Sequence, residues 1–259
     1  MYLKRYIPKA REESGDEFMI TYHLLSNQGD RGNNEDNVGM YQREQEYCFV
    51  LADGLGGHGK GELASQLGVE SSIKIFAVKG AGQESMDLSF KDAQKSILEK
   101  QSVDITARDM KTTLVILHIG ERKIWWGHIG DSRLYYFQNN KLIQRTLDHS
   151  VPQMLVAAGQ LKEKQIRNHP DRNRLLRVLG VDWDTPKYQL AEPKDRTGKQ
   201  AFLLCTDGFW ELIEEKKMQH CLKKAKTPEE WVKLMEEIVR KNGQGKNMDN
   251  YSAVAVWVE

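Results

Sequence analysis

The sequence predicts an α+β fold in which antiparallel β-sheets pack as a sandwich and helices cover both outer faces. Two observations lead to this prediction. Several strand-like runs follow one another across turns of a few residues, as in HIGERKIWW and YFQNNKL, and such hairpins build antiparallel sheets. Helical patterns occur in blocks between groups of strands, without the strict alternation of strand and helix that a parallel sheet requires.

Runs rich in β-branched and aromatic residues predict the strands. They occupy residues 19–25, 37–41, 47–52, 113–119, 123–129, 133–137, 141–145, 187–190, 200–206 and 251–258. Helices are predicted over residues 60–78, 86–107, 150–158 and 228–241. The last helix begins at Pro228 and repeats apolar residues at helical spacing from Trp231 to Ile238, which is typical of a helix that packs on a sheet.

The composition excludes several functional classes. The chain has 259 residues, with 38 Lys and Arg against 37 Asp and Glu, so its formal net charge is +1. This balance provides no overall field that would attract nucleic acid or an anionic membrane. The content of 39% hydrophobic and 29% charged residues is that of a globular domain rather than of a disordered chain. We therefore expect no nucleic-acid partner and no membrane association.

The cysteines and the chain's organisation indicate one domain in a reducing compartment. Cys48, Cys205 and Cys221 are too few and too widely spaced for a disulfide framework, so we expect buried thiols in a cytoplasmic protein. The sequence has no apolar run of 18 residues, no secretory leader pattern and no internal repeat. We expect the charged, aperiodic residues 1–17 to form a flexible leader and residues 18–259 to form a single domain.

Acidic residues stand beside five of the predicted strands. They are Glu35 and Asp36, Asp53, Asp131, Asp207 and Asp249. Asp53 and Asp207 each follow a buried apolar run and are each followed by a glycine. One such residue usually caps a turn, but five positions together indicate that the strand ends converge.

Converging carboxylates favour a site for divalent cations. They repel one another and raise each other's pKa unless a cation neutralises them. Oxygen ligands, without Cys or His at zinc spacing, favour Mg²⁺ or Mn²⁺. A carboxylate that bridges two such ions is typical of sites where a hydroxide attacks phosphorus. Arg31, four residues before Glu35, could hold phosphate oxygens or could be a solvated surface residue.

The glycine-rich stretch of residues 54–61, GLGGHGKG, offers a different interpretation. It matches the dinucleotide pattern G-x-G-x-x-G and nearly matches the phosphate loop, which has Ser or Thr where this chain has Gly61. Asp53 directly precedes the stretch and would face the phosphates, and no regular strand–helix–strand units follow it. Nucleotide binding is therefore the less favoured function.

The motifs together resemble those of the metal-dependent type 2C protein serine/threonine phosphatases in their bacterial single-domain form, from about residue 22 to residue 258. The matching segments are GDRGNNEDN (29–37), ADGLGGH (52–58), GELAS (61–65), TT (112–113), GDSR (130–133), DHS (148–150), RNRLLRVLG (172–180), CTDG (205–208) and DNYS (249–252). The resemblance implies a sandwich of two antiparallel sheets with helices outside, and residues 18–259 would be the phosphatase catalytic domain.

The resemblance also implies a role for each acidic position. Two tightly bound Mn²⁺ or Mg²⁺ ions would share Asp53 as a bridge, with Asp207 and Asp249 on the first ion and the Gly54 carbonyl on the second. Glu35 and Asp36 would act mainly through metal-bound waters.

A weaker third ion would take Asp131 together with Asp207, and Arg31 would grip the substrate phosphate. The segment of residues 150–180 corresponds to the family's mobile flap, a source of substrate selectivity.

The sequence departs from the family pattern at two positions. Leu55 stands where animal members carry a His that is proposed to protonate the leaving group, and Lys111 replaces the usual Gly before the threonine pair. His58 is the nearest titratable donor in sequence, so it would act as that acid, contact the phosphate or pack within its loop. Water on a third metal ion is the alternative proton source.

We therefore expect a cytoplasmic, monomeric enzyme that hydrolyses phosphoserine and phosphothreonine on proteins through a metal-bound hydroxide. Its partners would be phosphorylated proteins, a bacterial-type serine/threonine kinase that it opposes, and that kinase's targets. A regulatory module that binds phosphoproteins without turning them over is the alternative. The presence of Asp53, Asp207 and Asp249 argues against that alternative.

Overall fold

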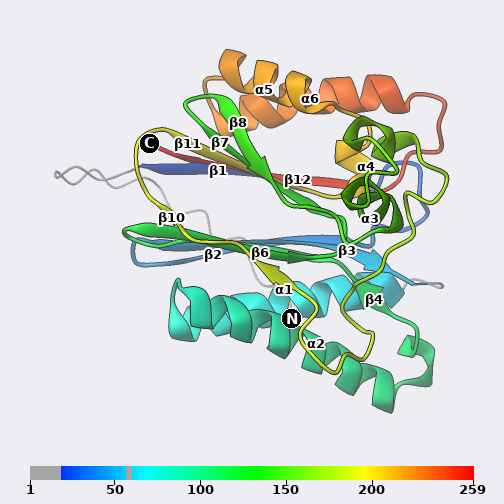
Figure 1. The fold of residues 1–259 in the computed structure, drawn as a ribbon. Coiled ribbons are helices and arrows are strands. Elements are labelled where there is room, and N and C mark those ends of the chain that lie inside the picture. Colours follow the sequence, from blue (N-terminus) through cyan, green and yellow to red (C-terminus); the bar gives the residue numbers. More distant parts are fainter. Residues whose placement is uncertain (1–18, 57–59) are drawn as a thin grey trace.

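The structure is a computed structural model that describes residues 19–56 and 60–259. Within those residues the chain forms two antiparallel β-sheets that face each other, with helices on both outer faces (Figure 1). The predicted fold class is confirmed. The expected leader at residues 1–17 and the candidate residue His58 lie outside the described residues.

The first sheet has the strand order β1-β12-β11-β7-β8. Its strands are β1 (Ile20–Asn27), β12 (Tyr251–Val258), β11 (Gln200–Cys205), β7 (Arg133–Gln138) and β8 (Lys141–Arg145). The second sheet has the order β10-β6-β5-β3-β2, with β4 paired to β3 and β9 paired to β6. Its strands are β10 (Lys194–Asp195), β6 (Lys123–Ile129), β5 (Leu114–Ile119), β3 (Glu46–Leu55), β2 (Asp36–Arg43), β4 (Lys111–Thr112) and β9 (Gln189–Leu190).

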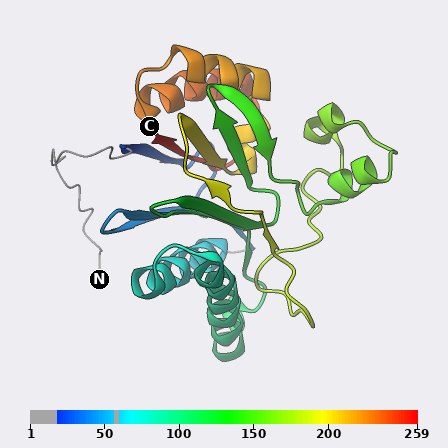
Figure 2. The same cartoon turned by 60° about the vertical axis from the view of Figure 1, so that its left-hand side comes forward.

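Helices α5 (Glu215–Lys224) and α6 (Pro228–Gly243) cover the first sheet, and α1 (Lys60–Lys79) and α2 (Gln83–Val103) cover the second (Figure 1). The helices α3 (Val151–Ala157) and α4 (Asp207–Trp210) and the 3₁₀ turns η2 (Ile105–Ala107) and η3 (Glu163–Asn168) are shorter. Figure 2 shows α3 and the turn after it standing out beside the sandwich. In the described part of the chain, no helix is long and apolar enough to cross a membrane.

Alternation along the central strands explains their continuous apolar runs. On β3, Phe49 and Leu51 pack between the sheets, whereas Cys48, Val50 and Ala52 pack under the helices. Both faces of the strand are therefore buried, and successive side chains fill different cores. The strands β11 and β12 are built in the same way, with alternate residues in the core between the sheets and in the core under α5 and α6.

The helix α6 shows how local sequence sets an element's bounds. The Thr227 side chain accepts a hydrogen bond from the Glu230 N–H at 3.1 Å, and Pro228 occupies the first turn. Trp231 is fully buried, contacts the edge of Phe137 at 5.4 Å between ring centres and donates its indole N–H to the Met218 carbonyl. The predicted helix at residues 228–241 is confirmed, with two further residues at its end.

Some elements differ from the prediction. The chain forms two helices, α4 and α5, between residues 206 and 228, where no helix was predicted. They were missed because α4 has only four residues and α5 is mostly charged. The helix predicted at residues 86–107 begins at Gln83 and ends at Val103. It ends there because the Asp104 side chain accepts a hydrogen bond from the Thr106 N–H and caps the start of η2. The strand predicted at residues 187–190 is reduced to β9.

Replacement of Trp231 by Ala tests the core under α6. The substitution leaves a cavity beneath the helix, so the free energy of unfolding should fall by about 3–5 kcal/mol in urea denaturation. Val78→Ala is the matched control, because Val78 is 73% exposed and its substitution should change stability by less than about 0.5 kcal/mol. Equal effects of the two substitutions would contradict this account of the core.

Candidate active site

A cavity of about 320 Å³ lies at the end of the sandwich where β3 ends and α4 begins. Its lining residues are Arg31, Asn33, Glu35, Asp53, Gly54, Leu55, Gly56, Asp131, Asn173, Leu175, Asp207, Asp249 and Asn250. The cavity therefore brings together most of the site residues singled out in the sequence. Asp36 does not line it and lies buried on β2, opposite Asp53 in register.

The backbone of Asp53 is fixed by the threonine pair. The Asp53 N–H donates to Thr113 Oγ1 at 3.0 Å, and the Asp53 carbonyl accepts from the Thr113 N–H at 2.9 Å and from Thr112 Oγ1 at 2.8 Å. Thr113 Oγ1 also lies 2.8 Å from Ser132 Oγ, in the loop that carries Asp131. The two threonines and Ser132 therefore set the distance between two of the acidic loops.

Two glycines explain why the stretch after Asp53 is glycine-rich. A Cβ on Gly54 would lie 2.1 Å from the Gly61 carbonyl oxygen and 2.7 Å from the Glu35 carbonyl oxygen. The Gly54 N–H donates to that Glu35 carbonyl at 3.1 Å. A Cβ on Gly61 would lie 2.7 Å from the Gly54 carbonyl carbon, so the close approach of α1 to the turn after Asp53 requires a glycine at both positions.

Asp207 and Asp249 lie on turns that touch each other. Asp207 is the first residue of α4, and a Cβ on the next residue, Gly208, would lie 2.1 Å from the Asn250 carbonyl oxygen. The Asn250 side chain accepts from the Glu35 N–H at 2.8 Å and donates to the backbone carbonyls of the loop before β2. Asn250, for which no role was predicted from the sequence, therefore joins the segments that carry Glu35, Asp207 and Asp249.

The carboxylates are held in an environment that disfavours their charged form. Burial raises the pKa of Asp53 and Asp207 well above the ordinary range, and repulsion by neighbouring carboxylates raises it further. Burial, followed by like charges, raises the pKa of Asp36 and Asp131 to about 7. This cluster therefore carries an electrostatic cost that a bound cation would relieve.

Arg31 lies at the rim of the cavity and already has a carboxylate partner. Its guanidinium donates to Asp249 Oδ2 at 2.7 Å, and both side chains are about half exposed. The other oxygen, Asp249 Oδ1, accepts from the Asn250 N–H at 2.9 Å. An arginine in this position can exchange the carboxylate for another anion that enters the cavity.

The donor set fits a hard divalent cation. The acidic side chains that line the cavity present carboxylate oxygens, which are the atoms that Mg²⁺ and Mn²⁺ prefer. Beside the cavity, Asp36 Oδ1 is buried without a hydrogen-bond partner among the described residues. In residues 19–56 and 60–259, no three Asp, Glu, His or Cys side chains are gathered closely enough to hold an ion. A bound ion would therefore require the carboxylates to move inward, and Asp249 would have to leave Arg31 in order to serve as a ligand.

Two cavity residues come from the predicted flap. Asn173 and Leu175 line the cavity, and Leu175 forms an isolated β-bridge with Ser150. The sequence motif RNRLLRVLG contains both residues but does not show which side chains face the cavity. Leu55 adds an apolar side chain to the wall.

Comparisons with known proteins agree with this geometry. The family model described as Protein phosphatase 2C matches residues 26–250. The serine/threonine phosphatase stp of Listeria welshimeri is 29% identical over 233 residues, which cover 87% of this chain and 90% of that protein.

Solved structures are similar over nearly the whole chain. Stp1, a serine/threonine phosphatase from Staphylococcus aureus, superposes with a TM-score of 0.83 at 25% identity and covers 98% of this chain and 100% of that chain. The catalytic domain of the serine threonine protein phosphatase PstP, in complex with two manganese ions, has a TM-score of 0.79 at 26% identity. That comparison covers 93% of this chain and 99% of that chain.

Asp207→Asn should stabilise the protein in the presence of a chelator. The folded pKa of Asp207 lies above its unfolded value, so ionisation costs stability as the pH rises from about 4 through the folded pKa. Asparagine removes that cost, so Tm should rise by about 2–4 °C for each kcal/mol by which the free energy of unfolding increases. The rise in Tm should be larger at about pH 8 than at about pH 5.

Asp184→Asn is the control, because it removes an exposed carboxylate remote from the cavity lining. A gain in Tm that is independent of pH, or a loss at about pH 8, would show that ionisation of the buried Asp207 carboxyl is not the source of the cost.

Proposed function

Because this chain belongs to the protein phosphatase 2C family, we propose that its cavity hydrolyses phosphoserine and phosphothreonine on proteins with the help of Mn²⁺ or Mg²⁺. The observation that carries the proposal is the group of carboxylates from separate strand ends on one cavity, with raised pKa values and an arginine at the rim. The carboxylate group does not serve stability, because buried like charges destabilise a fold.

The roles proposed for the ligands follow the family pattern. Asp53 would bridge two ions, Asp207 and Asp249 would complete the first, and the Gly54 carbonyl would join the second. Glu35 and Asp36 would act through coordinated waters, and Asp131 with Asp207 would offer a weaker third site. When bound, these ions supply Lewis acidity at phosphorus and activate water for attack.

Arg31 would bind the phosphate oxygens of the substrate. Its guanidinium is half exposed at the cavity rim, and its present partner, Asp249, is a proposed ligand. Arg31 would turn from Asp249 to the phosphate, which would free the Asp249 carboxylate to hold a cation. Leu55 and Leu175 line the cavity with apolar surface, and Asn173 adds a polar contact from the flap.

The leaving alkoxide needs a proton donor. Leu55 cannot donate a proton, so the candidates are His58, the nearest titratable donor in sequence, and metal-coordinated water. His58 lies outside the described residues.

The biological setting is part of the proposal. Phosphorylated proteins would be the substrates of a monomeric cytoplasmic enzyme, and a bacterial-type serine/threonine kinase would be the activity that it opposes. The buried positions of Cys48, Cys205 and Cys221 support a reducing compartment. The relatives named above as serine/threonine phosphatases support the substrate class.

The two alternatives receive less support. Nucleotide binding through residues 54–61 is disfavoured because Gly61 packs against the Gly54 backbone. A phosphoprotein-binding module without turnover is disfavoured because such a module would not need the charged cluster of Asp53, Asp207 and Asp249.

Hydrolysis of a phosphothreonine peptide tests the proposal directly. Activity should require Mn²⁺ or Mg²⁺ and disappear in excess chelator, since the proposed nucleophile is a water that the bound ions activate. Substitution of a residue that only supports a metal ligand lowers metal affinity or activity by about 10–100-fold. Asp53→Asn changes a proposed ligand itself, so it should lower kcat/KM by about 100-fold or more.

The exposed Asp184→Asn variant should retain wild-type rates under the same conditions. Full activity after dialysis against chelator, or near-normal turnover by Asp53→Asn at saturating Mn²⁺, would refute the proposed function.

A further inference from the structure

Arg167, at the end of η3 in the flap segment, makes several contacts with the segment that follows Asp207. Its Nε donates to the Trp210 carbonyl at 3.1 Å, and its Nη2 donates to the Ile213 carbonyl at 3.2 Å and to Glu215 Oε1 at 2.7 Å. The side chain is only 14% exposed. These contacts tie the flap to α4, the helix that begins with Asp207.

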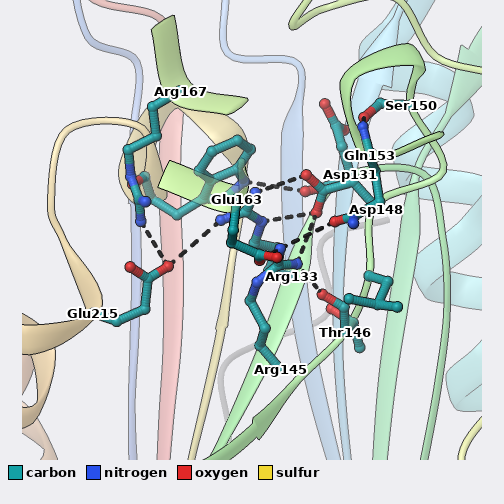
Figure 3. A network of polar contacts seen from close by, with 12 residues as sticks. Asp131, Arg133, Arg145, Thr146, Asp148, Ser150, Gln153, Glu163, Arg167 and Glu215 are labelled. Carbon is teal, nitrogen blue, oxygen red and sulfur yellow. Dashed lines mark hydrogen bonds and ion pairs between the residues drawn. The ribbon is translucent and has the colours of Figure 1, made fainter. Parts of the chain in front are cut away.

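Trp210 is held by two arginines. The guanidinium of Arg133 lies over the Trp210 ring, 3.4 Å from its centre, and that of Arg167 lies over it at 5.7 Å. Arg133 is fixed in turn by a buried bidentate pair with Asp148, at 2.7 Å for both contacts. Glu215 lies near both arginines, 2.7 Å from Arg167 and 3.7 Å from Arg133 (Figure 3).

The fixed tryptophan connects two of the acidic residues. Its indole N–H donates to the Asp131 carbonyl at 3.0 Å, and Trp210 lies three residues after Asp207 on α4. Trp210 is 1% exposed, so it cannot shift without repacking its neighbours. The position of Trp210 therefore sets where the backbone of Asp131 lies relative to Asp207.

We propose that Arg167 is a positioning residue for the metal centre: by its hydrogen bonds from the flap to Trp210 at the end of α4 and to Ile213 and Glu215 after it, it holds Asp207 and Asp131 in the arrangement that binds cations. The proposal rests on the ligand roles given under the proposed function. The flap would then support the ions that Asp207 would hold, as well as forming a wall of the substrate cavity. An ion held by the Gly54 carbonyl would not depend on this support, because the threonine pair fixes the backbone at Asp53.

Calorimetric titration of the metal-free, full-length protein with Mn²⁺ tests the proposal without relying on activity. Arg167→Gln removes all three hydrogen bonds, so the affinity of one of the two tight sites should fall by about 10-fold or more, while the other site keeps its affinity. Arg167→Lys retains the charge but cannot reach both carbonyls and the carboxylate, so its effect should be intermediate. Lys164→Gln, an exposed change on the same turn, should bind as the wild type does.

The outcomes separate this proposal from the proposed function. Failure of the wild-type protein to bind Mn²⁺ would refute the function itself. Wild-type affinity at both sites in Arg167→Gln would overturn the positioning role, and so would an equal loss at both sites with a lowered Tm, which indicates general destabilisation. If Arg167→Gln does not fold, Arg167→Lys decides, because unchanged affinity in that variant would also overturn the proposal.

Discussion

Mutual repulsion among the carboxylates at one end of the sandwich is the constraint on which the site depends. Asp53 and Asp207 are held where burial and like charge both oppose ionisation, and Asp36 is more deeply buried still. A fold gains nothing from such a cluster unless a cation joins it. The cluster also explains the ion pair of Arg31 with Asp249, which supplies part of the missing positive charge at the rim.

The scaffold keeps the cluster together by fixing backbones rather than side chains. Strands with both faces buried provide rigid supports, and their ends carry the acidic residues. Asp53 is held by the threonine pair, and the turns of Asp207 and Asp249 meet at a glycine that has no room for a side chain.

Periodicity and turn chemistry predicted the sheets, most helix positions and the acidic strand ends, because those features are local. The sequence could not show that Arg31 pairs with Asp249, since 218 positions separate them. Nor could the sequence show the hydrogen bonds that Arg167 donates to the Trp210 and Ile213 carbonyls, because every residue has a backbone carbonyl. The helix α5 was missed because its buried residues, Met218, Cys221 and Leu222, are few among lysines.

Proton release on metal binding tests the central claim most directly. If cations relieve repulsion among carboxylates with raised pKa values, Mn²⁺ binding must displace protons, and calorimetry in buffers of different ionisation enthalpy measures their number. With the pKa of Asp36 and Asp131 at about 7, and the pKa of Asp53 and Asp207 well above the ordinary range, we expect the release of about one proton or more near pH 6.5. Mn²⁺ binding with no proton release at this pH would contradict the claim.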